Sequence, residues 1–249
     1  GKSVKCRHAA VGSLGSVGVL VSGSIGRNPH REATDKPEVM IRKWTLSTRS
    51  GTAEMGDRGT EYSNPVVRDN TLVFGNRSIG LISVYPRIQQ QRWVLPVPKG
   101  VISELTLDKS SVYFGGGDGF LYSVALETGH VNWRYELRNP HISRPTLANG
   151  RVLVSTSDDT VMALDASTGK WLWDYERKTA ASATILGASS PRVDGQQVLV
   201  GMSDGFLIAL QFEDGQLRWE RRIHSGAKFT DVDASPVIEG DTMFVPSYD

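Results

Sequence analysis

The chain has 249 residues, and its 28 lysine and arginine side chains nearly balance 27 aspartate and glutamate side chains. This length is enough for one sizeable domain, and the balanced charge argues against a general surface for nucleic acid or anionic membranes, which needs a basic excess. The single cysteine, Cys6, excludes an internal disulfide and a cysteine-based zinc site, and no run of residues is apolar over the length that a membrane-spanning helix needs.

Residues 1–38 differ from the rest and are predicted to be a leader-like segment followed by a linker. Basic residues from Lys2 to Arg7 precede an uncharged run rich in Gly, Ser and Val, which is typical of a secretory leader. A Gly/Ser-rich tail is the alternative. Ser24 stands where the lipidated Cys of a bacterial lipoprotein box would stand, so either a Cys has been replaced or the likeness is a coincidence. We expect no lipidation at Ser24 itself.

Residues 39–249 are predicted to form a β-propeller. Segment 39–46 is expected to be a lone strand that includes Trp44 and closes a blade. Four stretches then repeat one pattern, in which tight turns separate two short apolar runs from a third run that contains Trp. The tryptophans that mark this repeat stand 40, 40 and 46 residues apart, at Trp93, Trp133, Trp173 and Trp219. A period of about 40–50 residues with four strands is typical of antiparallel propeller blades, so the predicted fold class is all-β.

The predicted blades do not close a ring. Full blades are expected near residues 63–93, 101–137, 141–175 and 188–222, and a partial fifth blade begins at residue 231. Open blades expose unpaired strand edges, which favour aggregation. The sequence therefore indicates either a piece of a longer protein or a dimer that covers its edges.

Most glycines and tryptophans are assigned to architecture. The Gly of Asp118-Gly119 and of Asp204-Gly205 tolerates the positive φ of a tight turn. The Gly-rich stretch 115–119 precedes a strand rather than the helix that a phosphate-binding loop opens, so it is interpreted as a turn. The repeated tryptophans are expected to be buried between neighbouring blades with their indole N–H groups bonded.

The residues show no catalytic or metal-binding motif. The five histidines lack the spacing of a metalloprotease motif, and no G-x-S-x-G elbow is present. We therefore predict neither an enzyme nor a cofactor. Asp231 and Asp233 stand out, because carboxylates two residues apart in a strand point to one side. They are interpreted as a turn or cap, as a polar contact to a partner protein, or as part of a calcium site.

Three segments resemble a known family. Residues 163–173, ALDASTGKWLW, are similar to the repeat of the pyrroloquinoline-quinone-type propellers. Residues 229–237, FTDVDASPV, resemble a D-V-D-x-x-P-V segment of the BamB-like outer-membrane assembly lipoproteins, and residues 187–191 resemble the G-x-x-x-P entrance of their preceding blade. The resemblance covers about residues 39–249. It implies an eight-bladed, non-catalytic propeller on the periplasmic face of the outer membrane of a Gram-negative bacterium.

The resemblance also implies a partner. Members of the family dock on the periplasmic POTRA domains of BamA, the barrel-inserting subunit. Carried over by motif, the partner-binding residues are Asp231 and Asp233 in one connection between blades, and Ala183, Ile185 and Leu186 in another. The chain departs from the family at Leu186, where the family has Arg, and in its missing blades. Neither nucleic acid nor a small-molecule substrate is expected, and a lipid anchor in the outer membrane would require Cys in place of Ser24.

Two other functions stay open at the level of the sequence. Quinone-dependent dehydrogenases share the blade repeat, but their propellers are typically much longer and bring a calcium ion and often an adjacent cysteine pair. A propeller that binds sugar or peptidoglycan would use exposed aromatic side chains such as Tyr62, Phe120 and Phe206.

Overall fold

The computed structural model describes residues 8–12, 16–21, 41–47, 63–178, 189–223, 235–239 and 242–244, and it places side chains within residues 63–178, 189–223 and 235–236. Every regular element in these ranges is a β-strand, which confirms the all-β prediction. Within the same ranges, no helix has the length and apolarity needed to cross a membrane.

Four antiparallel sheets of four strands each form four consecutive blades. Blade 1 consists of β4 (Val66–Arg68), β5 (Thr71–Asn76), β6 (Gly80–Tyr85) and β7 (Gln90–Pro96). Blade 2 consists of β8 (Thr106–Leu107), β9 (Ser111–Gly115), β10 (Phe120–Ala125) and β11 (Val131–Glu136). Blade 3 consists of β12 (Thr146–Ala148), β13 (Arg151–Ser155), β14 (Thr160–Asp165) and β15 (Trp171–Glu176). Blade 4 consists of β16 (Arg192–Asp194), β17 (Gln197–Gly201), β18 (Phe206–Gln211) and β19 (Leu217–Arg222).

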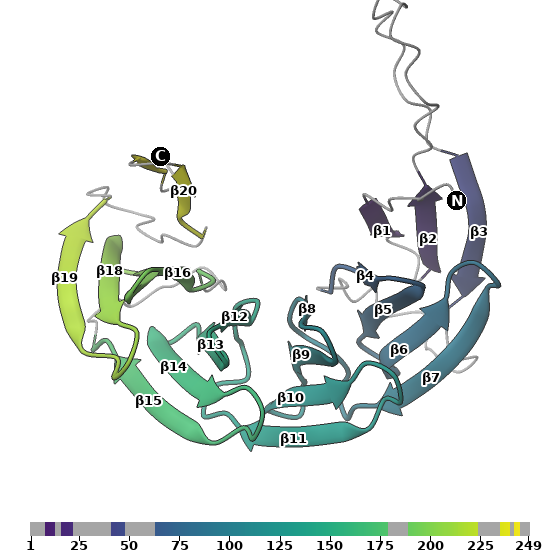
Figure 1. Cartoon of the computed structure of the whole chain (residues 1–249), viewed down its shortest axis with the longest axis horizontal. Coiled ribbons are helices and arrows are strands. Elements are labelled where there is room, and N and C mark those ends of the chain that lie inside the picture. The colour runs from purple at the N-terminus through teal and green to yellow at the C-terminus, as the bar shows by residue number, and fades with distance from the viewer. Residues whose placement is uncertain are drawn as a thin grey trace, which may run out of the picture.

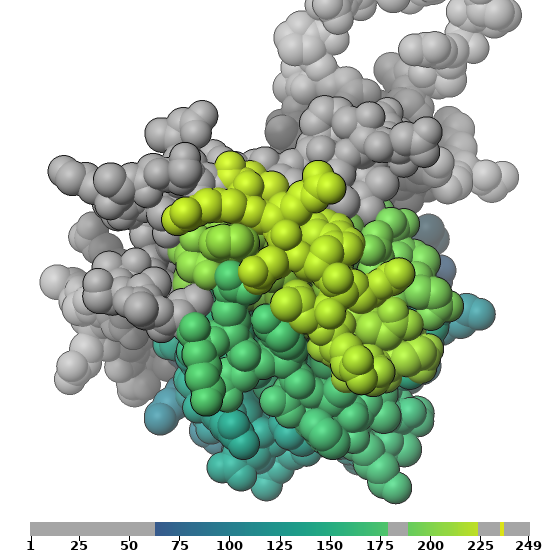
Figure 2. Space-filling model, turned by 90° about the vertical axis from the view of Figure 1, so that its left-hand side faces the viewer, coloured from purple at the N-terminus to yellow at the C-terminus, as the bar shows by residue number. Residues whose placement is uncertain are grey.

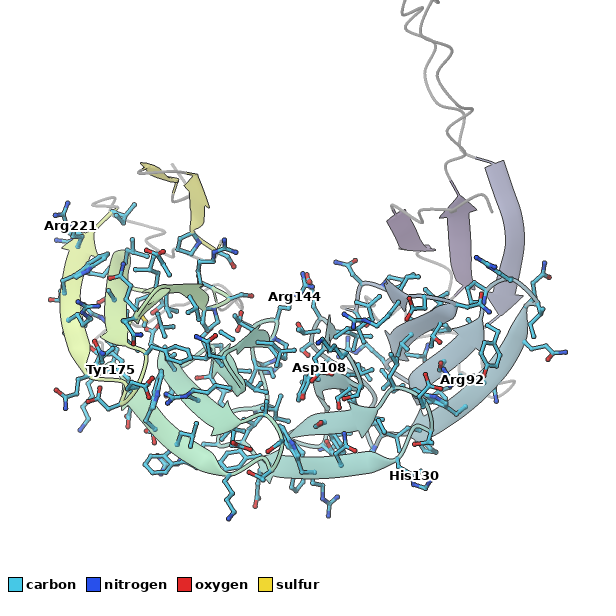
Figure 3. All side chains as sticks on the ribbon, viewed as in Figure 1. Arg92, Asp108, His130, Arg144, Tyr175 and Arg221 are labelled. Carbon is cyan, nitrogen blue, oxygen red and sulfur yellow. The ribbon has the colours of Figure 1, made fainter. Side chains whose placement is uncertain are left out.

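The blades follow one another around an arc that is open on one side (Figure 1). The first strands, β4, β8, β12 and β16, lie towards the inner side of the arc, and the last strands, β7, β11, β15 and β19, form its outer rim. Arg144 stands on the inner side and His130 on the rim (Figure 3). The described part of the chain therefore agrees with the prediction that these blades do not close a ring.

Two smaller sheets flank the four blades. Strands β1 (His8–Gly12), β2 (Ser16–Val21) and β3 (Ile41–Ser47) form a sheet beside blade 1, and β20 (Val237–Glu239) pairs with β21 (Thr242–Phe244) beyond blade 4. The prediction of a lone strand at residues 39–46 is wrong, because β3 pairs antiparallel with β2. The valines of the run interpreted as a leader also suit short strands, since β-branched residues are enriched in pleated sheets. The leader and its boundary at residue 38 stay predictions, and Ser24 lies outside the described residues.

A tryptophan in the outer strand of a blade attaches that blade to the next one. Its indole N–H donates to a backbone carbonyl of the following blade, at 3.0 Å from Trp93 to Leu126, 2.9 Å from Trp133 to Ala166 and 3.0 Å from Trp173 to Phe212. Trp133 is 9% exposed and Trp173 only 3%. The predicted burial between blades, with the N–H group bonded, is therefore confirmed for Trp133 and Trp173, whereas Trp93 is partly buried with its N–H group bonded.

Small residues make room for the tryptophans. Directly across the ladder from each Trp stands a buried Ser or Ala, in the pairs Ser83–Trp93, Ser123–Trp133, Ala163–Trp173 and Ala209–Trp219. The ring of one blade then lies on a turn glycine of the next, namely Gly129, Gly169 or Gly215. These glycines have φ between 70° and 74°, and an added Cβ would come within 2.7 Å of the indole. Trp and Gly thus form one repeated contact between blades.

The hydrophobic core is divided into layers that lie between neighbouring blades. One layer joins blades 1 and 2, a second joins blades 2 and 3, and a third joins blades 3 and 4. The third layer contains Leu153, Val161, Ala163 and Trp173 from blade 3 and Val198, Val200, Met202, Ile208, Leu210 and Phe212 from blade 4. A blade therefore buries its apolar faces only against its neighbours, as expected for a repeat architecture.

The connections between blades begin on one face of the arc. There, the residue after each outer strand donates its backbone N–H to the turn between the second and third strands, in the pairs Val97–Ile79, Leu137–Gly119, Arg177–Asp159 and Ile223–Gly205. We call this side, marked by the turns at residues 77–79, 117–119, 157–159 and 203–205, the connection face. The predicted Asp-Gly turns lie here, with φ of 92° at Gly119 and 84° at Gly205.

Candidate functional site

The sequence-predicted partner-binding residues lie outside the described residues. Ala183, Ile185 and Leu186 belong to segment 179–188, and Asp231 and Asp233 belong to segment 224–234. The structure does describe the residues on both sides of these two segments. Both segments border blade 4, because the first leads from β15 into β16 and the second leads away from β19.

Blade 3 anchors both ends of the first segment. Before it, the N–H of Arg177 donates to the carbonyl of Asp159 at 3.1 Å. After it, the carbonyl of Ser189 accepts from the hydroxyl of Ser155, and the carbonyl of Pro191 accepts from the hydroxyl of Thr146 at 2.7 Å. The chain therefore leaves and re-enters the described structure at fixed points.

Blade 4 anchors the start of the second segment. The N–H of Ile223 donates to the carbonyl of Gly205 at 2.9 Å, on the connection face. Seen from the side, blade 4 covers the front of the molecule above blade 3 (Figure 2). Both predicted docking segments therefore start from the same face of the arc, one on each side of blade 4.

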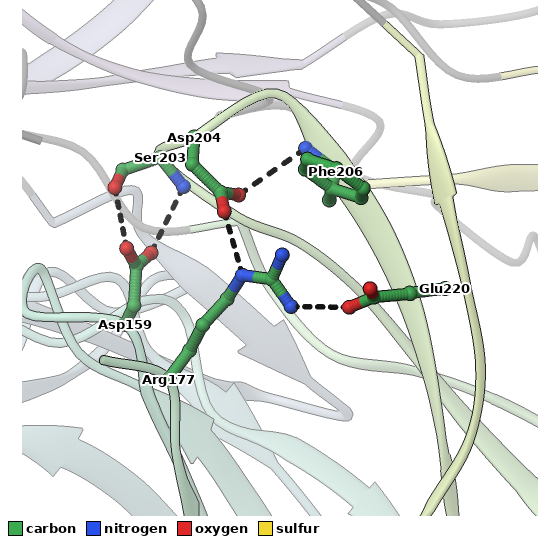
Figure 4. A network of polar contacts seen from close by, with 6 residues as sticks. All are labelled: Asp159, Arg177, Ser203, Asp204, Phe206 and Glu220. Atoms are coloured by element: carbon green, nitrogen blue, oxygen red, sulfur yellow. Dashed lines mark hydrogen bonds and ion pairs between the residues drawn. The ribbon is translucent and has the colours of Figure 1, made fainter. Parts of the chain in front are cut away.

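A charged network joins blades 3 and 4 at this place (Figure 4). Arg177 donates from Nε to Asp204 Oδ2 at 2.7 Å and from Nη1 to Glu220 Oε2 at 2.6 Å. Its guanidinium also lies over the ring of Phe206, 4.7 Å from the centroid. Burial lowers the pKa of Arg177, but the hydrogen bonds to Glu220 and Asp204 outweigh it and shift the pKa upward. Arg177, just after the last strand of blade 3, is thus bonded to the turn before β18 and to strand β19 of blade 4.

Asp159 adds a second link between the same blades. It is buried, and its carboxylate accepts from the N–H of Ser203 at 2.9 Å and from the Ser203 hydroxyl. Burial raises the pKa of Asp159, and the hydrogen bonds from Ser203 lower it by less. Asp159 has φ of 58° in the turn position that Gly119 and Gly205 hold in other blades. Asp in a Gly position is thus explained by a contact to the next blade.

Sequence reasoning missed this network. It assigned no role to Asp159 or Arg177. The difference between Asp-Asp in blade 3 and Asp-Gly in blades 2 and 4 was the available signal. The partner of Asp159 stands 44 residues away, and no local pattern identifies it.

Of the aromatic residues that would serve a sugar site, Phe120 and Phe206 have rings that are already covered by arginine side chains. Phe120 and Phe206 are only partly exposed, and the guanidinium of Arg134 lies over the Phe120 ring at 4.7 Å from its centroid. Arg177 and Arg222 occupy the Phe206 ring in the same way. Tyr62 lies outside the described residues. The rings of Phe120 and Phe206 therefore already serve as packing surfaces for arginine.

Within residues 63–178 and 189–223, no three His, Cys, Asp or Glu side chains come together as a metal site would require. The calcium interpretation of Asp231 and Asp233 falls on residues outside these ranges. The described residues provide fixed charges and a rigid backbone where segments 179–188 and 224–234 begin. Rigid scaffolds commonly present binding residues on such connections.

The comparison with known families decides which propeller this is. The family model described as outer membrane protein assembly factor BamB matches residues 100–249. The chain belongs to the BamB family. The match covers blades 2, 3 and 4 and both predicted docking segments.

Relatives extend the BamB likeness over nearly the whole chain. Outer membrane protein assembly factor BamB of Shewanella oneidensis is 28% identical over 260 residues, which cover 95% of this chain. The same alignment covers 64% of that protein, so the chain spans less than two thirds of this curated relative.

Solved structures agree on the fold. The crystal structure of BamB from Moraxella catarrhalis matches with a TM-score of 0.67 at 22% identity, over 76% of this chain and 59% of that one. Quinohemoprotein alcohol dehydrogenase from Comamonas testosteroni matches with a TM-score of 0.55 at 14% identity, over 74% of this chain and 39% of that one. These structures share the propeller fold, which confirms the predicted blade architecture.

Proposed function

We propose that this chain is a non-catalytic scaffold of the machinery that assembles β-barrel proteins in the outer membrane, and that it docks on the POTRA domains of BamA. The family match carries the first half of this proposal. The proposed location is the periplasmic face of the outer membrane, with a lipid anchor only if Cys stands at position 24 in the cell. The proposed domain division is a leader-like segment and linker at residues 1–38 and a propeller at residues 39–249.

One structural observation supports the docking half. The two segments that hold Ala183, Ile185, Leu186, Asp231 and Asp233 both start from the connection face on either side of blade 4. Blade 4 is fixed to blade 3 by Trp173, by Arg177 and by a continuous apolar layer. A rigid base limits the entropy that a docking surface loses on binding. Ile185 and Leu186 are proposed as the apolar anchor, and Asp231 and Asp233 as acidic contacts to basic partner groups.

The test is the affinity of the chain for the POTRA domains of BamA from the same organism, measured by calorimetry with the molar mass of the chain determined alongside. Asp231→Ala with Asp233→Ala is expected to weaken binding by about tenfold or more, since charged contacts in an interface contribute about 1.5 kcal/mol or more. Unfolding by urea should be unchanged, because the change is confined to one connection.

Asp174→Ala with Glu176→Ala is the matched control, because it removes two carboxylates at the same spacing from the outer strand β15. The control should bind POTRA domains like the unchanged chain. If the Asp231 and Asp233 variant keeps full affinity, the residue assignment is wrong. If the unchanged, folded chain does not bind at all, the proposed partner is wrong.

A further inference from the structure

The outer strands of all four blades share one irregularity. The ladder to the preceding strand skips a residue just before each Trp, which is a β-bulge. The residue pairs at the bulge are Gln91-Arg92, Val131-Asn132, Trp171-Leu172 and Leu217-Arg218. The second position is polar in three blades and apolar only in blade 3, so the fold itself does not require Leu172.

Two of the three polar residues at this position, Arg92 and Asn132, take part in the blades' own contacts. Arg92 donates to Thr71 at 2.9 Å and forms an ion pair with Glu127 of the next blade. Asn132 donates to Ser111 and Ser123 at 3.1 and 3.2 Å. Leu172 has no such polar role and is 38% exposed.

Trp171 stands beside Leu172 and is 53% exposed. Its indole N–H donates to Asp174 Oδ1 at 2.8 Å, on the same strand. This bond fixes the ring on the rim of the molecule before any partner arrives. An exposed Trp held in one orientation is the kind of residue that contributes most at protein interfaces, because little side-chain entropy remains to be lost.

The backbone of β15 offers an open edge at the same place. β15 is the last strand of its sheet, and in the described part of the chain no strand pairs with its outer edge. Because the N–H of Arg177 bonds inward to Asp159, the alternation of an antiparallel ladder turns the N–H and C=O groups of Asp174 and Glu176 outward. These groups are available to an added strand.

The outer edges of β15 and β19 differ in charge. The charged residues within β15 are Asp174 and Glu176, whereas β19 carries Arg218, Arg221 and Arg222 with one Glu. Lys170 precedes β15, at the end away from the two carboxylates. Positive side chains on edge strands commonly block pairing with other chains, and β15 itself contains none.

We propose that the outer edge of β15 binds an extended peptide segment as a fifth strand of blade 3, with apolar side chains at alternate positions of one half of the segment and basic side chains at alternate positions of the other half, because Trp171, Asp174 and Glu176 lie on one face of β15. Main-chain hydrogen bonds to Asp174 and Glu176 supply affinity, Trp171 and Leu172 receive the apolar side chains, and the two carboxylates select basic ones. This site is separate from the proposed POTRA docking segments and does not rest on them.

The test uses a synthetic peptide of about ten residues, long enough for one strand, that carries valine or tyrosine at alternate positions of one half and lysine at alternate positions of the other half, with threonine between them. Calorimetry should give a dissociation constant of about 10–100 μM, in the range of weak interfaces. Amide hydrogen exchange at Asp174 and Glu176 should slow when the peptide is present, which side-chain contact alone would not cause.

The variant Trp171→Gln with Leu172→Asn uses residues that blades 1 and 2 hold at these positions, and it keeps the net charge. It should bind the peptide at least tenfold more weakly and still bind POTRA domains. The control Leu217→Gln, at the equivalent position of β19, should bind the peptide normally. A peptide with N-methyl groups on consecutive residues, which block both of its edges, should not bind the unchanged chain, and this measurement needs no variant.

Three results would overturn the proposal. The first is that the Trp171 and Leu172 variant binds the peptide as tightly as the unchanged chain does. The second is that the N-methylated peptide binds. The third is that the unchanged chain shows no saturable binding of the peptide at concentrations up to about 1 mM. A peptide with glutamate in place of lysine should bind more weakly, and equal binding of both peptides would remove the role given to the two carboxylates.

Discussion

Asp159 is the residue at which blade 3 departs from its neighbours. A non-glycine residue at φ of 58° is unfavourable, but Asp is among the residues that tolerate this conformation best. The carboxylate gains two hydrogen bonds from Ser203 of the next blade and loses its solvation. The carboxylate of Asp159 therefore links two blades, while burial opposes its charge.

The pH dependence of stability follows from this conflict. The folded chain holds the Asp159 proton more tightly than the unfolded chain, because burial raises the pKa above its ordinary value. Within the window from the unfolded pKa, about 3.9, up to the raised folded value, the folded state binds more protons, so this group's contribution to stability falls as pH rises.

Asp159→Asn should abolish that fall, because Asn keeps an acceptor for the Ser203 N–H and tolerates the same φ. Urea unfolding measured between pH 4 and pH 8 would show a flatter profile for the variant and a free energy of unfolding at pH 7 at least equal to that of the unchanged chain. Asp158→Asn, one residue earlier in the turn, is the control and should keep the original profile. A variant profile that still falls as steeply would contradict this account.

At the scale of the strands and turns, neighbouring blades are joined by the contact between Trp and Gly. Trp133 of β11 lies on Gly169, in the turn before β15, and bonds to Ala166 in the same turn. The glycine is required twice, once for its φ of 70° and once because the ring leaves no room for a Cβ. A second glycine of blade 3, Gly150, has φ of 76° but nothing within 4 Å of an added Cβ.

Substitutions at Gly150 and Gly169 distinguish the cost of backbone strain from the cost of overpacking, because both glycines have positive φ but only Gly169 lies against a ring. Gly150→Ala should lower the free energy of unfolding by about 1–2 kcal/mol, the cost of a left-handed conformation for a residue with a Cβ. Gly169→Ala should lower it by a further ~1–3 kcal/mol, because the methyl group overpacks the Trp133 ring. Thermal or urea unfolding measures both values. Equal losses would mean that the indole moves away easily and that the contact contributes little.

At the scale of the whole molecule, the described blades form a row in which each contacts its neighbours. Stability in such an array is close to a sum of blade terms and interface terms. The interface between blades 3 and 4 contains the most polar links, through Arg177, Asp159 and Arg151. Weakening one interface should therefore affect the blades unequally.

Arg177→Ala should weaken the interface between blades 3 and 4 and change the amide hydrogen exchange rates of the blades unequally. The Arg177 side chain is 13% exposed, and its carboxylate partners are 21% exposed at Asp204 and 43% exposed at Glu220, so we expect a loss of about 2 kcal/mol at this interface, mainly from the pair with Asp204. Amides of β17 and β18 should then exchange about thirtyfold faster, while those of β9 and β10 keep their rates. Arg144→Ala, which removes an exposed pair at 3.9 Å, should change no rate appreciably. Uniform acceleration in all blades would instead show that the array opens as one unit.

The sequence by itself determined the repeating unit of this protein. Short apolar runs, turn glycines with positive φ and a Trp opposite a small residue are local features, and each follows from backbone sterics or strand alternation within one blade. They were enough to predict four meander blades and the burial of Trp133 and Trp173, because every copy repeats the same signals. The family resemblance rested on residues 163–173, 187–191 and 229–237 and was confirmed by the match over residues 100–249.

Only the tertiary structure decided what joins the blades. Asp159 and Ser203 are 44 residues apart, Arg177 and Glu220 are 43 apart, and β3 pairs with β2, which lies in the segment that composition alone assigned to a leader. The packing of adjacent blades brings such partners together, and a local sequence pattern does not predict which residues will meet. The outer edge of β15 is a further case, since the sequence shows Trp171 and Leu172 but only the sheet order shows that they border an unpaired strand.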